Sequence, residues 1–392
     1  MDNPSSSFDV AVVGGGAIGL TVAWRAAQHG SRVVVLERRG PGGGASWVAA
    51  GMLAPVTEAT LLEQAILHLG LASARAYPNF VEELSEASGI DPGYLPSGML
   101  VVARDRDEAE ALERELEMRR ALGLSVNRLR PSQARALVPA LAPAVRLALE
   151  VAGDHAVDPR KLTASLVAAA RSAGVELRTG VEVEGIEISE GSVRLTSGER
   201  VAAEQVVIAA GAWSDAIDGI PDAARVPIHP VKGQILRLHD PGGPGLLGRV
   251  LRMTSGYLVP RGDGRYVLGA TMEERGFDTT VTAGAVFELL RDAGELIPGI
   301  SELVIDEIIA GLRPATPDNA PAIGPASVPG LHWAVGHYRN GILLAPITAD
   351  IVVAGLTGAE PSELAAPFSP GRFAAPARAA STPETPTLPV EA

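Results

Sequence analysis

The chain has 392 residues, 46% of them hydrophobic, which predicts two structural domains with a substantial core. Its formal net charge of −13 argues against a nucleic-acid backbone or an anionic membrane surface as the main partner. The absence of cysteine excludes disulfides, thiolate nucleophiles, cysteine-based zinc sites, iron–sulfur clusters and a cofactor tethered through sulfur.

Residues 9–37 predict a strand, a glycine turn, a helix and a second strand. The apolar run Asp9–Val13 leads into Gly14–Gly19, Gly-Gly-Gly-Ala-Ile-Gly, which has the G-x-G-x-x-G spacing. An amphipathic helix is expected to about His29, and Arg32–Leu36 is expected to form the second strand.

The glycines of this turn have separate roles. Gly14 allows the tight turn, Gly16 lets the backbone approach a pyrophosphate, and Gly19 lets the helix pack closely on the strand. The phosphates would lie at the positive end of the helix dipole, and Glu37, 18 residues past Gly19 (37 minus 19), can accept both hydrogen bonds of a ribose diol. The unit therefore predicts an adenine dinucleotide site, and a purely structural glycine turn is the alternative.

The middle of the chain alternates between helices and strands. Gly40–Pro55 is a glycine- and alanine-rich connection, which suits either a flexible loop or a backbone that lies against a flat ring. Asp158 and Pro159 predict the start of a helix. We expect helices at 61–88, 105–123 and 159–173, strands at 98–103, 175–179, 181–189, 193–196 and 205–209, and a second strand-to-glycine turn at 210–214.

The last third of the sequence predicts a second sheet and a closing helix. Residues 226–269 are typical of several antiparallel strands separated by turns. A helix at 282–296, a strand at 304–312 and a final helix from Gly341 to about Gly358 are expected to follow. Residues 365–392 are rich in Pro, Ala, Ser and Thr without periodicity, which predicts a disordered tail.

Two observations favour a cytoplasmic protein with no membrane partner. Met1–Ser7 has neither the basic region nor the apolar core of a secretory signal. The longest apolar stretch, residues 341–356, contains Pro346 and Asp350 and is shorter than the roughly 20 residues that a membrane span needs.

One complete dinucleotide fingerprint leaves several cofactors open. A pyridine-nucleotide dehydrogenase would use it for NAD, and a flavin reductase would normally show two such fingerprints. A flavin oxidase needs one, because its electrons come from the substrate. The Glu37 carboxylate disfavours the 2′-phosphate of NADP, although Arg38 and Arg39 follow it.

Three runs carry a resemblance that goes beyond the fingerprint: residues 43–55, 311–318 and 336–346. Together they resemble the FAD-dependent D-amino-acid oxidase superfamily, and within it the glycine oxidase branch of the thiamine pathway. The similarity covers roughly residues 8–372. It implies one FAD, bound non-covalently, since the cysteine through which related sarcosine oxidases often attach FAD is absent.

The resemblance also implies the architecture. The expected fold class is α/β plus α+β, with a Rossmann-type FAD-binding domain on a parallel sheet and a substrate domain on a mixed, mainly antiparallel sheet. The FAD-binding domain would be discontinuous, made of residues 8–85, 150–220 and 320–362. The substrate-binding domain would take residues 86–149 and 221–319.

Four residues match the family's substrate site. Arg313 matches an arginine that binds the substrate carboxylate, and Tyr257 matches a tyrosine whose hydroxyl touches the same carboxylate. Arg339 matches a second active-site arginine, and Met272 resembles a residue of the pocket wall. Each residue also has a structural alternative: an ion pair for Arg313, a place in the core for Tyr257, a helix-end hydrogen bond for Arg339 and apolar packing for Met272. Ser255 stands where these oxidases commonly have histidine, which leaves the fine substrate preference open.

The family's FAD contacts map onto residues throughout the chain. The helix that begins at Gly341 would direct its free N–H groups at the flavin edge where negative charge accumulates on reduction. The alternative is that the glycines and alanines at the strand ends only pack against their neighbours and do not contact FAD. The expected cofactor-binding residues are Gly14, Gly16, Ala17, Ile18, Gly19, Glu37, Arg38, Ser46, Ala49, Ala50, Gly51, Met52, Val183, Gly211, Trp213, Arg313, Arg339, Asn340, Gly341 and Ile342.

The implied activity is oxidative deamination of glycine and similar small amines, with O2 as the electron acceptor and hydrogen peroxide as a product. The main alternative is a flavin-dependent D-amino-acid, sarcosine or proline dehydrogenase that passes electrons to a quinone or carrier. A protein that keeps FAD only as a scaffold is a third. The partners would be a small amino acid and O2, and family resemblance suggests a homotetramer.

Overall fold

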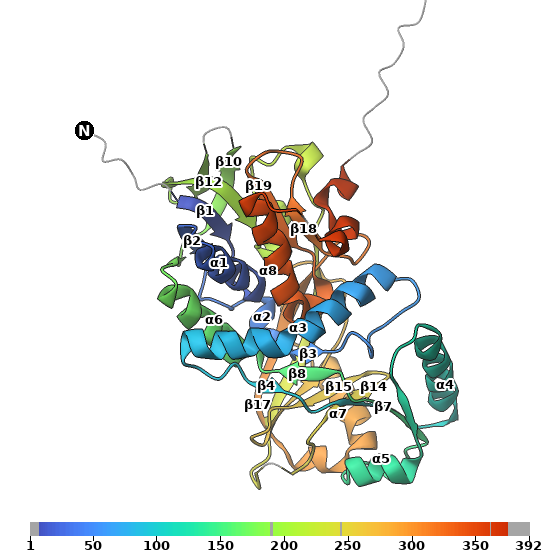
Figure 1. The fold of residues 1–392 in the computed structure, drawn as a ribbon. Helices are drawn as coiled ribbons and strands as arrows, with labels where there is room; N and C mark the ends of the chain where they lie inside the picture. The colour runs from blue at the N-terminus through green and yellow to red at the C-terminus, as the bar shows by residue number, and fades with distance from the viewer. Residues whose placement is uncertain (1–7, 189–190, 244, 361, 375–392) are drawn as a thin grey trace, which may run out of the picture.

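The structure, a computed structural model, describes residues 8–188, 191–243, 245–360 and 362–374. Within these residues the strands form two eight-stranded sheets and a small three-stranded sheet (Figure 1). The first large sheet and its helices lie at one end of the molecule, and the second large sheet lies at the other. This division agrees with the expected fold class.

The centre of the first sheet is parallel. β1 (Phe8–Val13) lies between β12 (Arg200–Ile208) and β2 (Val33–Glu37), and β9 (Glu176–Thr179) follows β2. The apolar residues of β1 and β2 are buried on both faces, as expected for a parallel sheet covered on two sides. The antiparallel strands β10 (Val183–Glu187) and β11 (Ser192–Leu195) extend one edge, and β19 (Leu331–Val335) and β18 (Ala322–Pro325) branch from β12.

Helices cover one face of this sheet. They are α1 (Ala17–Gln28), α3 (Gln64–Ser88), α6 (Pro159–Ser172) and α8 (Gly341–Thr357). Val10 and Val12 of β1 join the core of these helices, while Ala11 and Val13 face the core on the opposite side. As predicted, the Asp158 side chain caps α6 by accepting a hydrogen bond from the Arg160 N–H at 3.0 Å.

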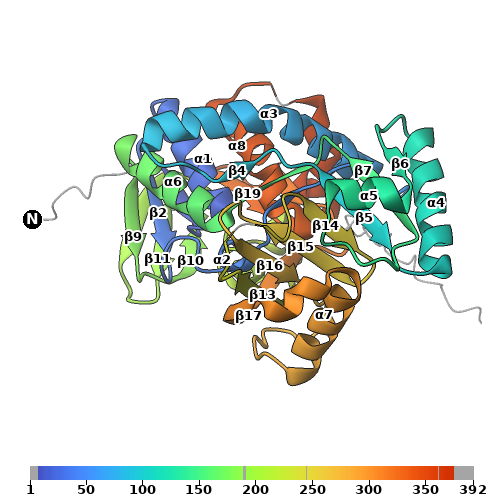
Figure 2. The same ribbon diagram turned by 90° about the horizontal axis from the view of Figure 1, so that it is seen from below.

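The second large sheet has the strand order β17-β13-β16-β15-β14-β5-β7-β6 and is antiparallel except where β14 pairs with β5. Helices α4, α5 and α7 lie around it (Figure 2). Its elements are β5 (Met99–Ala103), α4 (Arg106–Ala121), β6 (Asn127–Leu129), α5 (Pro131–Leu137), β7 (Leu147–Val151), β13 (His229–His239), β14 (Val250–Met253), β15 (Gly256–Pro260), β16 (Arg265–Gly269), α7 (Ala283–Leu296) and β17 (Val304–Ala315).

Short elements connect the two large sheets. The third sheet joins β3 (Met52–Leu53), β8 (His155–Val157) and β4 (Tyr94–Leu95), and the one-turn helix α2 (Ala45–Val48) lies in the glycine-rich connection. The expected domain boundary between residues 149 and 150 falls inside β7, all of which belongs to the second sheet. The division into domains otherwise stays a prediction.

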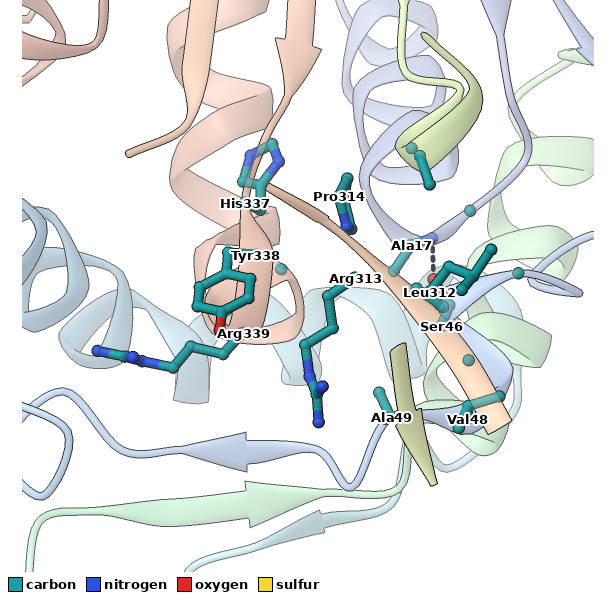
Figure 3. Close-up of a pocket in the computed structure, with 18 of the residues that line it drawn as sticks. Ala17, Ser46, Val48, Ala49, Leu312, Arg313, Pro314, His337, Tyr338 and Arg339 are labelled. Carbon is teal, nitrogen blue, oxygen red and sulfur yellow. Dashed lines mark hydrogen bonds between the residues drawn. The ribbon is translucent and has the colours of Figure 1, made fainter. Parts of the chain in front are cut away.

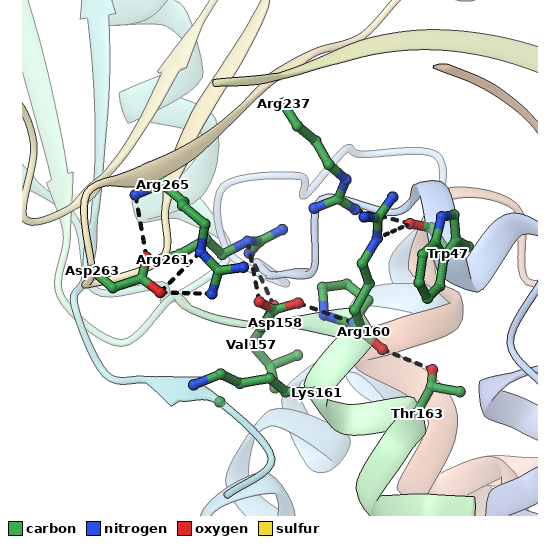
Figure 4. A network of polar contacts seen from close by, with 12 residues as sticks. Trp47, Val157, Asp158, Arg160, Lys161, Thr163, Arg237, Arg261, Asp263 and Arg265 are labelled. Carbon is green, nitrogen blue, oxygen red and sulfur yellow. Dashed lines mark hydrogen bonds and ion pairs between the residues drawn. The ribbon is translucent and has the colours of Figure 1, made fainter. Parts of the chain in front are cut away.

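A polar network fastens α2 and α6 to the second sheet (Figure 4). The Trp47 carbonyl accepts hydrogen bonds from Arg160 at 3.3 Å and Arg237 at 2.8 Å. The Arg160 guanidinium also lies 3.8 Å from the Trp47 ring centroid and 2.5 Å from a carboxylate oxygen of Glu307 on β17. The network therefore fixes the glycine-rich connection against the strand that carries Arg313.

The expectation of a disordered tail from residue 365 is wrong for its first ten residues. Short 3₁₀ helices form at Glu363–Phe368 and Pro370–Phe373. Phe368 is 1% exposed, and Arg372 pairs with Asp318 at 2.8 Å. One buried aromatic ring and one ion pair anchor a segment whose composition resembles disorder. Residues 375–392, Met1–Ser7 and Ser189, the end of a predicted strand, lie outside the described residues.

The expectation that the final apolar stretch is too short for a membrane also needs correction. One helical segment among the described residues, Tyr338–Thr357, has 20 residues and a mean hydropathy of 1.5, so it is long and apolar enough to cross a membrane. In the structure 61% of its most apolar window is buried, and α8 packs against α1 and α3. Burial marks α8 as a core helix.

Candidate active site

A cavity of about 1060 Å³ extends from the glycine turn after β1 to the strands of the second sheet. Both large sheets contribute to its walls, so residues far apart in sequence face one space. This volume is at the upper end of ligand pockets and suits a dinucleotide together with a small second molecule.

The glycine turn has the geometry that its spacing predicts. Gly14 has a φ of +108°, and a Cβ there would overlap the Ala209 carbonyl. A Cβ on Gly19 would overlap the Gly14 carbonyl oxygen, so this glycine permits the close packing of α1. The Gly15 N–H donates to Glu37 Oε2 at 2.7 Å, which joins the turn to the end of β2.

The start of α1 and the end of β2 supply polar groups for a dinucleotide. No side chain caps α1 at Gly16, and the Ala17 N–H donates to Ser46 Oγ at 3.0 Å. Glu37 Oε1 accepts from the Arg39 N–H at 2.7 Å. Each Glu37 oxygen thus accepts one backbone hydrogen bond and has a further lone pair that can accept a hydrogen bond from a ribose hydroxyl.

Flat and small residues line the end of the cavity that lies beside Glu37 and the first sheet. The Arg38 guanidinium lies 4.4 Å from the Trp213 ring centroid and pairs with Glu182 at 3.2 Å. Gly211 has a φ of +58°, and a Cβ there would meet nothing within 4 Å. Val183 also belongs to the wall. Room beside an aromatic surface is what a planar base requires.

Arg313 points from β17 into the opposite end of the cavity (Figure 3). Its Nη1 donates to the carbonyls of Lys232 at 3.3 Å and Thr271 at 3.2 Å. A Cβ on Gly233 would stand 2.6 Å from Arg313 Cζ, so glycine provides the space for the guanidinium. Arg313 has no ion pair with any residue that the structure describes, which leaves its charge available to an anion.

Tyr257 lies on β15, directly opposite Gly269 of β16. A Cβ on Gly269 would stand 2.8 Å from the Tyr257 hydroxyl, so a second glycine makes room for a polar group of the cavity. Burial raises the pKa of Tyr257, and the nearby cations Arg313 and Arg252 act against this rise. The hydroxyl therefore stays protonated at neutral pH and can donate a hydrogen bond.

The structure places Arg339 and Met272 at the same end, in settings that differ from Arg313. Arg339 pairs with Glu58 at 3.3 Å and with Glu63 at 2.8 Å. Met272 is 67% exposed, and its sulfur accepts a hydrogen bond from the Tyr338 hydroxyl at 3.1 Å. Tyr338 has a φ of +49°, which is uncommon for a residue with a side chain.

The amino end of α8 reaches the cavity through Gly341 and Ile342. No side chain caps this helix at Asn340, so its first N–H groups are available to a ligand. His337 precedes the helix and bonds Thr348 at 2.9 Å. Burial lowers the pKa of His337 to about 3, which keeps the imidazole neutral at neutral pH.

Nearly all the predicted site residues share this cavity. Gly19 instead lies behind the turn, and Asn340 lines a small neighbouring pocket. Sequence reasoning missed Glu58, Arg252 and Tyr338. Of these, only Tyr338 lies in a run that carried a resemblance. The predicted residues in the cavity wall are Gly14, Gly16, Ala17, Ile18, Glu37, Arg38, Ser46, Ala49, Ala50, Gly51, Met52, Val183, Gly211, Trp213, Tyr257, Met272, Arg313, Arg339, Gly341 and Ile342.

This arrangement suits an oxidoreductase that binds a dinucleotide, with Arg313, a cation unpaired among the described residues, in the same cavity. The described residues contain no group of three or more metal-ligating side chains. The amino ends of α1 and α8, the Glu37 carboxylate and the space beside Trp213 all suit FAD.

Comparisons with known proteins agree with this class. The model of the family described as "FAD dependent oxidoreductase" (DAO) matches residues 9–354. Glycine oxidase of Geobacillus kaustophilus is 37% identical over 92% of this chain and 96% of its own length. The bifunctional protein ThiO/ThiG of Trichormus variabilis is 35% identical over 93% of this chain, which spans 55% of that protein.

A solved structure gives the same result. The crystal structure of glycine oxidase from Geobacillus kaustophilus has a TM-score of 0.87 and 36% identity, with 93% of this chain and 98% of the other covered. The chain therefore belongs to the FAD dependent oxidoreductase (DAO) family, is of the glycine oxidase type, and uses FAD as its cofactor.

Proposed function

We propose that the protein catalyses the oxidative deamination of glycine and of similar small amines such as sarcosine and D-alanine. Glycine, O2 and water would give glyoxylate, ammonia and hydrogen peroxide, and sarcosine would release methylamine. The observation that carries the proposal is Arg313, a cation without an ion pair among the described residues, in the same cavity as the dinucleotide turn.

In this proposal Arg313 fixes the substrate. A guanidinium binds a carboxylate through two parallel hydrogen bonds, which sets both the position and the direction of a small amino acid. The Tyr257 hydroxyl, kept protonated by its raised pKa, donates a further hydrogen bond to the carboxylate. Gly233 and Gly269 support the pair by leaving space for both side chains.

Bound FAD supplies the chemistry of the step, since it accepts two electrons and a hydrogen from the α-carbon as hydride. The chain's residues provide orientation and electrostatics. The free N–H groups at the start of α8 favour negative charge nearby. His337 is a weak base, because burial lowers its pKa and its ring is bonded to Thr348, so the substrate reacts with its amine already deprotonated.

Oxygen consumption with glycine tests the proposal. The purified, FAD-loaded protein should consume O2 and release one equivalent of hydrogen peroxide and of glyoxylate. Arg313→Ala should lose this activity while it keeps FAD. Reduction of an artificial dye without peroxide formation would favour the dehydrogenase alternative, and an Arg313→Ala variant with normal efficiency would overturn the carboxylate assignment.

Three further proposals rest on relatives and composition. The similarity to ThiO/ThiG supports a role in thiazole formation for thiamine biosynthesis, where the imine product would be used. A homotetramer in the cytoplasm follows from the family resemblance, and exposed Val304, Ile305 and Ile308 on the edge strand β17 suit a subunit contact. Light scattering tests the tetramer, and deletion of the gene tests the thiamine requirement.

A further inference from the structure

A carboxylate stands between two arginines at the substrate end of the cavity. Glu58 Oε1 lies 3.1 Å from Arg252 Nε, and Glu58 Oε2 lies 3.3 Å from Arg339 Nε. Arg339 also pairs with Glu63 at 2.8 Å. Both arginines are therefore charge-compensated, whereas Arg313 pairs with no carboxylate in the described part of the chain.

Arg252, Glu58 and Arg313 act electrostatically on the Tyr257 hydroxyl. Arg252 and Tyr257 are directly opposite each other on β14 and β15, so their side chains lie on the same face of the sheet. The cations Arg313 and Arg252 both favour ionisation of Tyr257 and thus act to lower its pKa, while Glu58 acts to raise it. Glu58 thus lies within electrostatic reach of the site to which a substrate carboxylate is assigned.

Two buried ions hold the backbone before Glu58. Asp154, with 0% exposure, accepts hydrogen bonds from the N–H groups of Thr57 at 2.6 Å and Val56 at 3.3 Å. Arg119, with 3% exposure, donates to the carbonyls of Val56 at 3.0 Å and Thr57 at 2.7 Å. Since buried ions are costly unless they are paired, this double attachment specifies one position for the Glu58 backbone.

We propose that Glu58 determines substrate specificity by restricting the cavity to one anionic site, at Arg313. This inference rests on the proposed function. The fixed Glu58 carboxylate neutralises Arg252 and Arg339 and repels a second anion. An amine whose nitrogen carries a second carboxylate, such as N-carboxymethylglycine, is therefore rejected, while glycine and sarcosine are accepted. Discrimination by a repulsive group is a common source of specificity.

Calorimetry of the FAD-loaded protein tests this role without turnover. The probes are glycolate, which has one carboxylate, and diglycolate, which has two, and neither carries an amine. The wild type should bind glycolate at least about tenfold more tightly, equivalent to about 1.4 kcal/mol. Glu58→Gln is nearly isosteric; it leaves Arg252 without a carboxylate partner and Arg339 paired only with Glu63, so the ratio of the two Kd values should fall by at least tenfold.

Glu63→Gln is the matched control, because Glu63 pairs with Arg339 but not with Arg252. Its Kd ratio should stay within about threefold of the wild-type ratio. A Glu58→Gln protein that holds FAD and keeps the wild-type ratio would overturn the inference. A wild type that binds diglycolate as tightly as glycolate would overturn it without any variant. Protein that binds neither probe would instead overturn the carboxylate site at Arg313, and the proposed function with it.

Discussion

Gly233→Ala is a small change next to the proposed carboxylate site. The new Cβ would overlap both Nη atoms of Arg313 and stand 2.6 Å from its Cζ, and ordinary contact begins at 3.4 Å, so the guanidinium must withdraw by at least about 0.8 Å (3.4 minus 2.6). The guanidinium is the far end of a flexible side chain, so it can move without disturbing the sheet. A shift of this size removes about one charged hydrogen bond, or roughly 1.5–3 kcal/mol.

The expected result is a roughly 10- to 150-fold fall in kcat/KM for glycine, mostly through KM, with Tm and FAD content unchanged. Alanine is tolerated in a strand at least as well as glycine, so a loss of stability is not expected. Gly284→Ala is the control, because Gly284 also lines the cavity but its Cβ would meet nothing within 4 Å. A Gly233→Ala enzyme within twofold of the wild type would refute the assigned position of Arg313.

Three other predictions concern the binding of the substrate carboxylate by Arg313, the buried acid Asp154 and the cofactor. Arg313→Lys keeps the charge but loses the bidentate fork, so kcat/KM for glycine should fall at least about tenfold in steady-state assays; unchanged kinetics would argue against carboxylate binding. Burial raises the pKa of Asp154 from 3.8 to about 6, so native protein binds this proton more tightly than unfolded protein and loses stability as pH rises toward 6. Between about pH 5 and pH 7.5 the wild type should therefore lose about 1.4 kcal/mol of unfolding free energy relative to Asp154→Asn in urea titrations, and parallel pH profiles would contradict the shift. Glu37→Ala should raise the Kd of FAD about tenfold in a titration of apoprotein, and an unchanged Kd would remove Glu37 from the ribose site.

Local patterns in the sequence were sufficient for much of the fold. The spacing of glycines after β1, the cap at Asp158 and the apolar runs of the strands depend on neighbouring residues, and each has the structure it predicts. The disorder predicted from residue 365 failed because a single buried ring, Phe368, anchors a segment of low-complexity composition. Burial of that kind depends on the rest of the fold.

The site was predictable only in part, for the same reason. Arg313 stands in a recognisable run, Gly-Leu-Arg-Pro, and the structure places it in the cavity with the dinucleotide turn. The pairing of Glu58 with Arg252 joins residues 194 positions apart, and neither residue stands in a motif. Only the folded chain brings this carboxylate between two arginines. The sequence therefore predicted that Arg339 belongs to the site, but not that it pairs with Glu58 and Glu63.

The visible spectrum of the purified protein during anaerobic addition of glycine, followed by air, tests the central claim most directly. The account predicts that glycine bleaches the bound flavin and that air restores the spectrum with release of one equivalent of hydrogen peroxide. Flavin that stays oxidised in the presence of glycine would contradict the proposed substrate. A protein that takes up no FAD would contradict the assignment of the cavity itself.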